Sequence, residues 1–417
     1  MEEFTLTEGQ QEAVDLLLKF KEDENAKVFI LKGFAGTGKS YLTSNYILKM
    51  FPKISLTATT HKACEAINKN LGYEEAITIH SRLKLKLKKE DHKQVLKRSD
   101  RDTEELDFSG VTLIDECSLI NDELLKYILE IDKVIFVGDP AQLEKIEDDS
   151  DSSEISKCFD LDTEYKIELT EITRQAKENP IISLSMDIRE SNDRFDLNKI
   201  MSSDKIYKVS VSDEDIAKSC ANAINAFKDS RVICYHNYRV IRMNNLIHKH
   251  LYGETLFPFS VGEKVMFNEM YELKITKNKK ENIEFRNNQE CTVMNIIHSP
   301  DDADVILVAL KTEKGKIIDN VPVNLKPHLI EKEVKSLFNK WFKDRDRNAL
   351  NEAWALKEKY APLRHCYAIT CFKSQGSSYD VAYVDLRDLD ALKASFSFNR
   401  ALYVATTRPK DTLIFNY

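Results

Sequence analysis

The run GFAGTGKS at positions 33–40 combines residue types that bind phosphate. Gly33 is followed, after four residues, by Gly38, Lys39 and Ser40, and such a loop turns successive backbone N–H groups toward phosphate oxygens. Lys39 is expected to reach the β and γ phosphates of a nucleotide, and the Ser40 hydroxyl to bind Mg²⁺. The motif therefore predicts a site for a nucleoside triphosphate with Mg²⁺. The other loop residues expected at the phosphates are Ala35, Gly36 and Thr37.

An acidic pair and a glutamine follow two later apolar runs. Asp115-Glu116 ends the run VTLID, and carboxylates at the carboxyl end of a parallel strand point into the crevice where ligands bind. Asp115 is expected to hold Mg²⁺ through water, and Glu116 to orient or deprotonate the attacking water. Gln142, in GDPAQ, has an amide that can contact the γ-phosphate or that water. Taken singly, a helix N-cap and a plain turn are the alternatives for these two motifs.

Two distant arginines are candidates for stabilising charge on the γ-phosphate. They are Arg174 in ELTEITRQ and Arg408 in LYVATTRPKDTL. Arginines that approach a nucleotide in this way accelerate phosphoryl transfer by about 10³–10⁵-fold. For each arginine alone, a surface salt bridge is the alternative.

The elements that would position these residues alternate between strand and helix. The phosphate motif lies between an apolar strand and an amphipathic helix, which an ordinary glycine turn does not explain. Alternation of this kind predicts an α/β fold with parallel sheets and crossover helices. The strands expected in the first half are 28–31, 54–59, 111–115 and 133–139.

A second α/β alternation begins near residue 181 and resumes over 366–416. Between these parts, residues 255–325 show alternating strands with polar turns, which predict a small antiparallel barrel. Residues 331–359 have the periodicity of a helical pair. Trp341 and Trp354 lie there and are expected to pack in a core rather than stack on bases.

Composition narrows the class of protein. The 417 residues predict two or three domains, and 42% hydrophobic with 31% charged residues suits globular cores. The eight cysteines form no C-x-x-C pair, so neither a disulfide framework nor a zinc knuckle is predicted. No apolar run reaches the roughly 18 residues of a membrane helix, and the N-terminus is acidic and polar. We therefore expect a cytoplasmic protein without a membrane partner.

The net charge of −8 argues mildly against nucleic acid, but it hides a basic segment. Residues 82–101 hold nine Lys or Arg and three Asp or Glu, a net of +6, so the remainder carries −14. Leucine and lysine alternate at 83–88, which predicts a half-buried strand with one cationic face, and VLK at 95–97 would complete a hairpin. A solvated surface hairpin and a nucleic-acid contact are both open for this segment. The lysines of the expected cationic face are Lys84, Lys86 and Lys88.

Nine motifs occur in the order found in superfamily 1 helicases. They are TEGQ, GFAGTGKS, TATTHKA, TIHS, LIDECS, GDPAQL, LTEITRQ, FKSQG and LYVATTR. The short GDPAQL form and FKSQG resemble group B of that superfamily, the RecD-like branch. The length, the basic hairpin, and the barrel with its helical pair most resemble the Dda-type helicases of phages.

The resemblance implies two RecA-like domains with ATP between them, a pin hairpin inserted in the first and a small β-barrel inserted in the second. It implies an ATP-dependent DNA helicase that moves along single-stranded DNA, 5′ to 3′, and unwinds forked duplexes. It also implies a monomer that works with replication or recombination proteins, in a host cytoplasm if the source is a phage. The expected domains are 1–81 with 110–176, the pin 82–109, 177–252 with 362–417, and the barrel with its extension 253–361.

The resemblance also assigns roles to single residues. Gln10 matches the adenine-reading glutamine, and Arg174 and Arg408 match the two arginines of the ATP site. In the first domain, Thr60, His61, Thr78 and His80 match motifs that line the single-stranded DNA path. In the second domain, the segment that contacts DNA and couples it to the nucleotide contains Thr370, Ser374 and Gln375.

Departures from the family pattern keep a second function open. Phe34 and Thr59 replace prolines, Phe372 replaces a histidine, and residues 82–107 contain no aromatic side chain to wedge base pairs apart. A single-stranded-DNA-stimulated ATPase that displaces bound proteins without efficient strand separation is therefore the alternative. A phosphate-loop switch or kinase is disfavoured, because no N-K-x-D segment is present and a small kinase has no role for the two arginine motifs.

Overall fold

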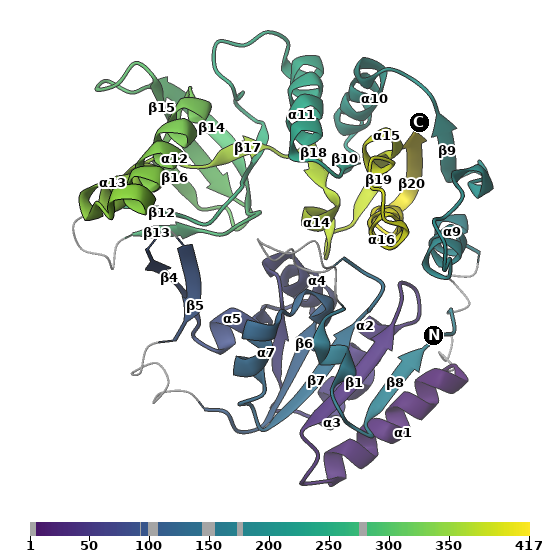
Figure 1. Ribbon diagram of the computed structural model, residues 1–417. Helices are drawn as coiled ribbons and strands as arrows, with labels where there is room; N and C mark the ends of the chain where they lie inside the picture. The colour runs from purple at the N-terminus through teal and green to yellow at the C-terminus, as the bar shows by residue number, and fades with distance from the viewer. Residues whose placement is uncertain (1–5, 92, 99–106, 144–154, 173–177, 275–281) are drawn as a thin grey trace.

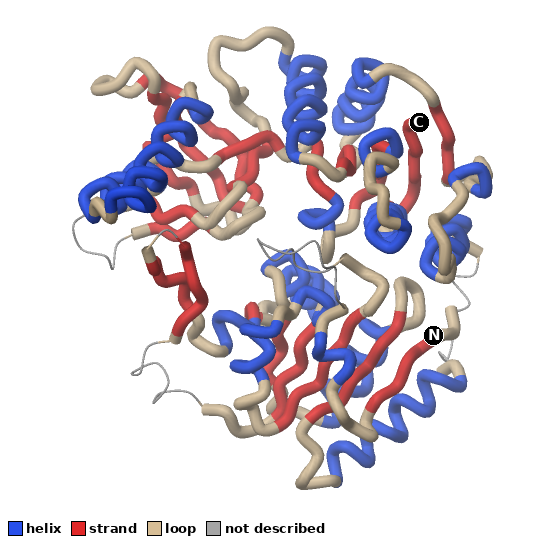
Figure 2. Tube along the Cα trace, viewed as in Figure 1, coloured by secondary structure: helices blue, strands red, loops and turns tan. Residues whose placement is uncertain are grey.

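The computed structural model describes residues 6–91, 93–98, 107–143, 155–172, 178–274 and 282–417. Two lobes, each built on a parallel sheet, lie one above the other in Figure 1, with an antiparallel module beside them. Figure 2 shows strands at the centre of each lobe with helices around them. The predicted α/β fold with two parallel sheets, a hairpin and an antiparallel module is confirmed.

The first lobe contains a six-stranded parallel sheet in the order β3-β2-β6-β7-β1-β8. Neighbouring residues of its central strand β1 (Val28–Gly33) enter different cores: Phe29 and Leu31 pack on one face, Ile30 on the other. Burial on both faces explains the continuous apolar runs in the sequence. The other strands are β2 (Ser55–Ala58), β3 (Ile77–Thr78), β6 (Val111–Asp115), β7 (Lys133–Gly138) and β8 (Lys166–Leu169).

Helices of the first lobe begin at polar caps. The Thr7 hydroxyl accepts from the Gln10 N–H, and the Gln10 side chain accepts from the Thr7 N–H, so α1 (Glu8–Glu22) starts with a capping box. The helix after the phosphate loop runs continuously through α2 (Lys39–Leu42), a π-helical turn (Thr43–Ile47) and α3 (Leu48–Met50). The remaining helices are α4 (His61–Leu71), α5 (Ile79–Arg82) and α7 (Asp122–Ile128), with 3₁₀ turns at Cys117–Leu119 and Lys157–Asp160.

The second lobe contains a five-stranded parallel sheet in the order β18-β10-β19-β20-β9. Its strands are β9 (Ile206–Val209), β10 (Ser230–Cys234), β18 (Ala368–Thr370), β19 (Tyr379–Asp385) and β20 (Pro409–Asn416). Its helices are α9 (Pro180–Arg189), α10 (Asp213–Asn225), α11 (Asn237–Tyr252), α14 (Cys371–Ser374), α15 (Leu386–Leu389) and α16 (Ser395–Thr406), with a 3₁₀ turn at Leu197–Lys199.

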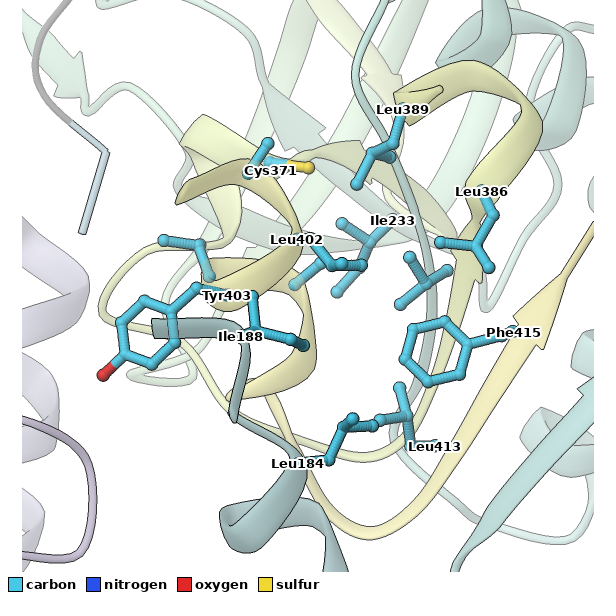
Figure 3. Close-up of a cluster of buried hydrophobic side chains, with 14 of the residues drawn as sticks. Leu184, Ile188, Ile233, Cys371, Leu386, Leu389, Leu402, Tyr403, Leu413 and Phe415 are labelled. Atoms are coloured by element: carbon cyan, nitrogen blue, oxygen red, sulfur yellow. The ribbon is translucent and has the colours of Figure 1, made fainter. Parts of the chain in front are cut away.

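The largest core of the second lobe packs α9 and α16 against this sheet. Figure 3 shows Leu402, Ile233 and Phe415 inside it, and Tyr403 at its edge with the hydroxyl pointing away from the apolar side chains. Helix α16 therefore anchors in its own lobe and presents a polar group outward.

The antiparallel module is inserted between α11 and β18. Its sheet order is β16-β15-β14-β11-β17, and the Ala361 N–H, just before β17, donates to Pro322 O of β16 at 2.8 Å. The two edges of the sheet therefore meet, as expected for a barrel. Its elements are β11 (Lys264–Phe267), β12 (Tyr271–Leu273), β13 (Ile283–Phe285), β14 (Glu290–His298), β15 (Val305–Thr312), β16 (Ile317–Asn324), α12 (Pro327–Asp344), α13 (Arg347–Lys357) and β17 (Leu363–His365).

The basic segment forms a hairpin of β4 (Lys86–Glu90) and β5 (Lys93–Lys97). The prediction that the strand starts at residue 83 is wrong: α5 ends at Arg82, and Lys84 has a left-handed backbone with φ 50°. Leu83 and Leu85 are buried in the core of the first lobe. The strand prediction failed because alternating leucines also fit a turn that follows a helix. Lys84 therefore does not share a strand face with Lys86 and Lys88.

Other expectations from composition concern cysteines and membranes. All eight cysteines are buried free thiols. Among the described residues, no helix combines the length and apolar character needed to cross a bilayer. Trp341 and Trp354 are each 7% exposed, which confirms the prediction that they pack in a core.

Candidate functional site

The phosphate motif forms a tight loop at the carboxyl end of β1. Gly36 and Gly38 both have φ 85°, a left-handed conformation that a residue with a Cβ adopts only with strain. A Cβ on Gly33 would lie 2.8 Å from Thr37 Oγ1, and that hydroxyl donates to Phe34 O at 2.8 Å. The glycines are therefore required by the shape of the loop.

Lys39 and Gln10 hold this loop from two sides. Lys39 Nζ donates to Gly33 O at 2.6 Å and to Phe34 O at 3.0 Å, so its ammonium group lies over the loop. Gln10 is 3% exposed, and its Nε2 donates to Thr37 O at 2.9 Å. Both the oxygen and the nitrogen of the Gln10 side-chain amide form hydrogen bonds within the protein. One of these hydrogen bonds must break before the amide can bind adenine.

Asp115 and Glu116 end β6, the neighbour of β7 in the sheet. Asp115 Oδ1 accepts from the Glu116 N–H at 2.9 Å, and Glu116 has a left-handed φ of 53°. Burial raises the pKa of Asp115. Burial also raises the pKa of Glu116 to about 7; the charge of Asp115 adds to this rise, whereas Arg408 and Lys39 oppose it. Two desolvated carboxylates with too little positive charge around them fit a divalent cation with oxygen ligands, and the Ser40 hydroxyl is of the same ligand type.

Gln142 and Asp139 lie in the loop after β7. Gln142 is 9% exposed, and its Oε1 is buried without a hydrogen-bond partner in the described part of the chain. Buried polar atoms are normally bonded, so this oxygen is suited to a ligand. Asp139 is fully buried and accepts from the Ala141 N–H at 3.0 Å.

The second lobe reaches the loops of the first through α16. The Tyr403 hydroxyl donates to the Asp139 carboxylate, and the Ala35 N–H donates to the same hydroxyl at 3.5 Å. Arg400 Nη2 donates to Pro140 O at 2.7 Å. One tyrosine of the second lobe therefore touches both the phosphate loop and the loop after β7. Sequence reasoning missed it, because a tyrosine in the apolar run LYVAT resembles an ordinary core residue.

The cations of the site come from both lobes. Arg408 is 7% exposed, its guanidinium donates to Val404 O at 3.0 Å and to Ser377 O at 3.2 Å, and its charge reaches Glu116. Arg174 lies outside the described residues. Arg189 of α9, which no motif indicated, lies 3.6 Å from Asp139 and 5.1 Å from the ring centroid of Phe34.

The predicted DNA residues of the first lobe lie at the starts of α4 and α5. Thr60 and Thr78 are the N-caps of these helices and accept from the N–H groups of Ala63 and Ser81. Burial, together with the charges of Arg286 and His80, lowers the pKa of His61 to about 4. His61 is therefore a neutral imidazole near pH 7, suited to a hydrogen bond rather than to an ion pair.

The predicted coupling segment of the second lobe meets these residues. Thr370 caps α14, and the Ser374 hydroxyl is fully buried and donates to Cys371 O at 2.7 Å. Gln375 Nε2 donates to Leu143 O of the first lobe at 2.6 Å. Gly376 has φ 72°, and a Cβ there would lie 3.4 Å from Thr60 Oγ1. The structure thus brings the two predicted DNA segments together across the lobes.

The turn of the basic hairpin rests on the helical pair. Trp354 Nε1 donates to Asp91 O at 2.8 Å, and Lys89 Nζ lies 5.1 Å from the Trp354 ring centroid. Lys89 also pairs with Glu358 just after α13. Figure 1 shows the hairpin pointing toward this module. Lys86 and Lys88 remain exposed on β4.

Comparisons with known proteins agree with this geometry. Residues 5–210 match the family described as AAA domain, and residues 365–415 match the UvrD-like helicase C-terminal domain. The uncharacterised protein R530 of Acanthamoeba polyphaga mimivirus is 25% identical over 494 aligned positions, which cover 97% of this chain and 98% of that protein. The family matches agree with the ordered motifs of superfamily 1 helicases, and the short GDPAQL form and FKSQG carry the resemblance to group B. The chain is an ATP-dependent DNA helicase by class.

Pif1 helicases are among the similar solved structures. Bacteroides Pif1 in complex with ADP-AlF3 and single-stranded DNA aligns with a TM-score of 0.55 and 18% identity, covering 100% of this chain and 93% of that one. A structure that addresses DNA unwinding at forked duplexes by two coordinating Pif1 helicases gives a TM-score of 0.54, 17% identity, and coverages of 100% and 92%. At these identities the likeness establishes the shared fold.

Replacing Tyr403 with Phe tests the contact between the lobes. The variant removes a hydrogen bond to a buried carboxylate, so the free energy of unfolding should fall by about 1.5–3 kcal/mol. Tyr383→Phe is the matched control: its hydroxyl faces the neutral Ser219 hydroxyl at 3.0 Å, and its loss should be about 0.5–1.5 kcal/mol. Urea denaturation followed by circular dichroism measures both, and equal losses would contradict the account of Asp139.

Proposed function

We propose that this helicase moves 5′ to 3′ along single-stranded DNA and separates strands at forked duplexes, using Mg²⁺·ATP bound between its two lobes. The observation that carries the proposal is the meeting of Tyr403 and Arg408 of the second lobe with the loops and acidic pair of the first. A nucleotide held there would change the position of one lobe relative to the other, so its hydrolysis could drive movement of the protein along DNA.

The roles in the ATP site follow from the chemistry of each side chain. Phosphate oxygens would replace the Gly33 and Phe34 carbonyls at Lys39 Nζ, while the loop N–H groups hold the remaining oxygens. Ser40 and Asp115 would hold Mg²⁺, which neutralises charge on the phosphates. Glu116 would accept the proton of the attacking water, and the unpartnered Gln142 Oε1 would position that water.

Charge developing at the γ-phosphate requires cations from the second lobe. Arg408 is held by backbone carbonyls at the interface and is proposed to fill this role together with Arg174. Closure of the lobes would bring these guanidinium groups to the phosphate, and release of phosphate would let the lobes reopen.

The DNA path is proposed to cross both lobes where Thr60 and Gly376 meet. Hydroxyl groups, the neutral imidazole of His61 and backbone N–H groups there suit phosphate and sugar contacts, which carry no sequence information. The half-buried rings of Phe372 and His236 lie near Tyr235, and the exposed Tyr238 lies beside His236. These rings are candidates for stacking with bases. Binding should weaken with salt, with a slope of about −0.7 per phosphate neutralised.

Fork unwinding is supported by the hairpin and by the likeness to Pif1 structures that concern single-stranded and forked DNA. Polarity is supported by membership in group B alone. The division into domains 1–81 with 110–176, 82–109, 177–252 with 362–417, and 253–361 belongs to the same proposal. A cytoplasmic location, a monomeric state, and association with replication or recombination proteins stay predictions.

The hairpin also supports a second candidate, an ATPase that strips proteins from single strands without efficient unwinding. Its sequence from 82 to 107 offers no aromatic wedge, and its turn is occupied by the contact with Trp354. Splitting base pairs would then depend on cations such as the exposed Lys86 and Lys88 of the hairpin.

Replacing Lys39 with Ala tests the proposed ATP site. Loss of the ammonium group should reduce DNA-stimulated ATP hydrolysis by about 10²-fold or more, because the transferring phosphoryl group loses a fixed cation. Phosphate release with saturating single-stranded DNA measures the rate. Lys19→Ala, on the exposed face of α1, is the control and should hydrolyse ATP at the wild-type rate. An unchanged rate for Lys39→Ala would show that the site is wrongly assigned.

Removing three charges from the basic segment separates unwinding from hydrolysis. The triple variant Lys84→Gln, Lys86→Gln and Lys88→Gln should weaken fork binding or unwinding several-fold, while ATPase activity without DNA stays unchanged. The triple Gln variant of Lys19, Lys21 and Lys27 removes the same charge elsewhere on the first lobe and should unwind normally. Wild-type unwinding by the first variant would exclude a role for these lysines at the fork.

A further inference from the structure

Three metal-ligating side chains meet where the antiparallel module joins the second lobe. His248 lies near the end of α11, Glu263 immediately precedes β11, and His365 ends β17. The chain leaves the second lobe after α11 and returns to it through β17, so the three residues bracket both connections. Their ligand atoms all lie within 4.8 Å of one another.

The carboxylate of Glu263 lies between the two imidazoles. His365 Nδ1 is 2.5 Å from Glu263 Oε1, and His248 Nδ1 is 3.2 Å from Glu263 Oε2. The two rings lie face to face, with centroids 4.6 Å apart and planes 30° apart. Glu263 is fully buried and His248 is 8% exposed, so water does not screen this cluster.

The contact of His248 Nε2 with Thr255 indicates that His248 Nδ1 carries no proton. Thr255 Oγ1 donates its proton to Phe257 O at 2.7 Å, so it faces His248 Nε2, 3.5 Å away, as an acceptor. Nε2 therefore carries the proton of the neutral ring, and Nδ1 directs a lone pair toward the Glu263 carboxylate. In the described part of the chain, this buried Nδ1 has no hydrogen-bond partner. A lone pair beside a carboxylate oxygen is repulsive unless a cation lies between them.

A metal ion would replace the hydrogen bond between His365 Nδ1 and Glu263 Oε1 and would also give His248 Nδ1 the partner that it lacks. Protonating both imidazoles would place two stacked cations 4.6 Å apart against one carboxylate. A single divalent ion would instead accept both Nδ1 lone pairs and a carboxylate oxygen. Two imidazoles with one carboxylate are a ligand set of zinc, and a histidine whose other nitrogen is hydrogen-bonded, as His248 is to Thr255, is typical of zinc sites.

The surroundings of the cluster are those of a structural metal site. The Ser260 N–H donates to Glu263 Oε2 at 2.9 Å and orients the carboxylate. Phe259 packs edge-on against the His365 ring, with centroids 5.3 Å apart.

We propose that His248, Glu263 and His365 bind one divalent transition-metal ion, zinc in preference to Mg²⁺, which fastens the antiparallel module to the second lobe. The site is separate from the nucleotide site, because all three ligands come from α11 and the two connections of the module. Its role is structural, since metal binding at both crossings restricts movement of the module relative to the lobe.

The test uses the untagged full-length protein, stripped with a chelator and then titrated with ZnCl₂ against a chromophoric competitor. We expect one zinc ion per chain. His365→Gln and Glu263→Gln should each weaken binding more than about 100-fold, beyond the loss typical of outer-shell substitutions. His250→Gln is the matched control: His250 lies on the same helix but contacts Glu214 at 2.9 Å, so its variant should bind zinc like the wild type.

A second measurement keeps the test independent of how the variants fold. Co²⁺ added to the stripped wild-type protein should give the visible absorption of a four- or five-coordinate site at one equivalent, and zinc should abolish it. Less than one equivalent of tight zinc, equal binding by His365→Gln and the wild type, or a cobalt spectrum typical of six oxygen ligands would each overturn the proposal. Any of these results would assign the cluster to an imidazolium–carboxylate contact.

Discussion

The structure depends on a buried polar contact between two lobes, beside which Phe34 and Leu143 of the first lobe extend the apolar core of the second. Tyr403 is held by the core of the second lobe, yet its hydroxyl bonds to Asp139 and receives the Ala35 N–H of the first. The nearby Arg408 lies close enough to lower the pKa of Glu116. The phosphate loop, the acidic pair and the loop after β7 all end at this interface, so the proposed nucleotide would lie where the two lobes meet. The motifs that define the helicase class and the residues of the candidate site therefore meet at one interface between the lobes.

The proposed DNA path of this acidic chain contains little positive charge. Several cations of the basic segment are used inside the protein: Arg98 bonds to Leu83 O and Glu130, Lys89 pairs with Glu358, and Lys97 pairs with Glu90. The predicted DNA path consists instead of helix-capping threonines, a neutral histidine and a glycine. The net charge is a property of the whole chain. The proposed DNA contacts involve only a few half-buried residues where the two lobes meet, such as Thr60, His61 and Gly376.

Local sequence patterns predicted the elements that carry the site. They could not predict contacts between residues that are distant in the chain. The strand before Gly33, the loop glycines and the strand ending at Asp115 follow from periodicity and motif spacing alone. Tyr403, Arg189 and the cluster of His248, Glu263 and His365 were missed, because each gains its meaning from residues distant in the chain. Leucines at 83 and 85 were misread as a strand, since period-2 alternation does not exclude a turn after a helix.

Strand separation on forked DNA tests the central claim most directly. Forks with a single-stranded tail on either the 5′ or the 3′ strand are incubated with the protein, with and without ATP, and the release of the labelled strand is measured. The account predicts ATP-dependent release from the fork with the 5′ tail and none from the fork with the 3′ tail. Release from the 3′-tailed fork, or DNA-stimulated ATP hydrolysis that leaves both forks paired, would contradict it.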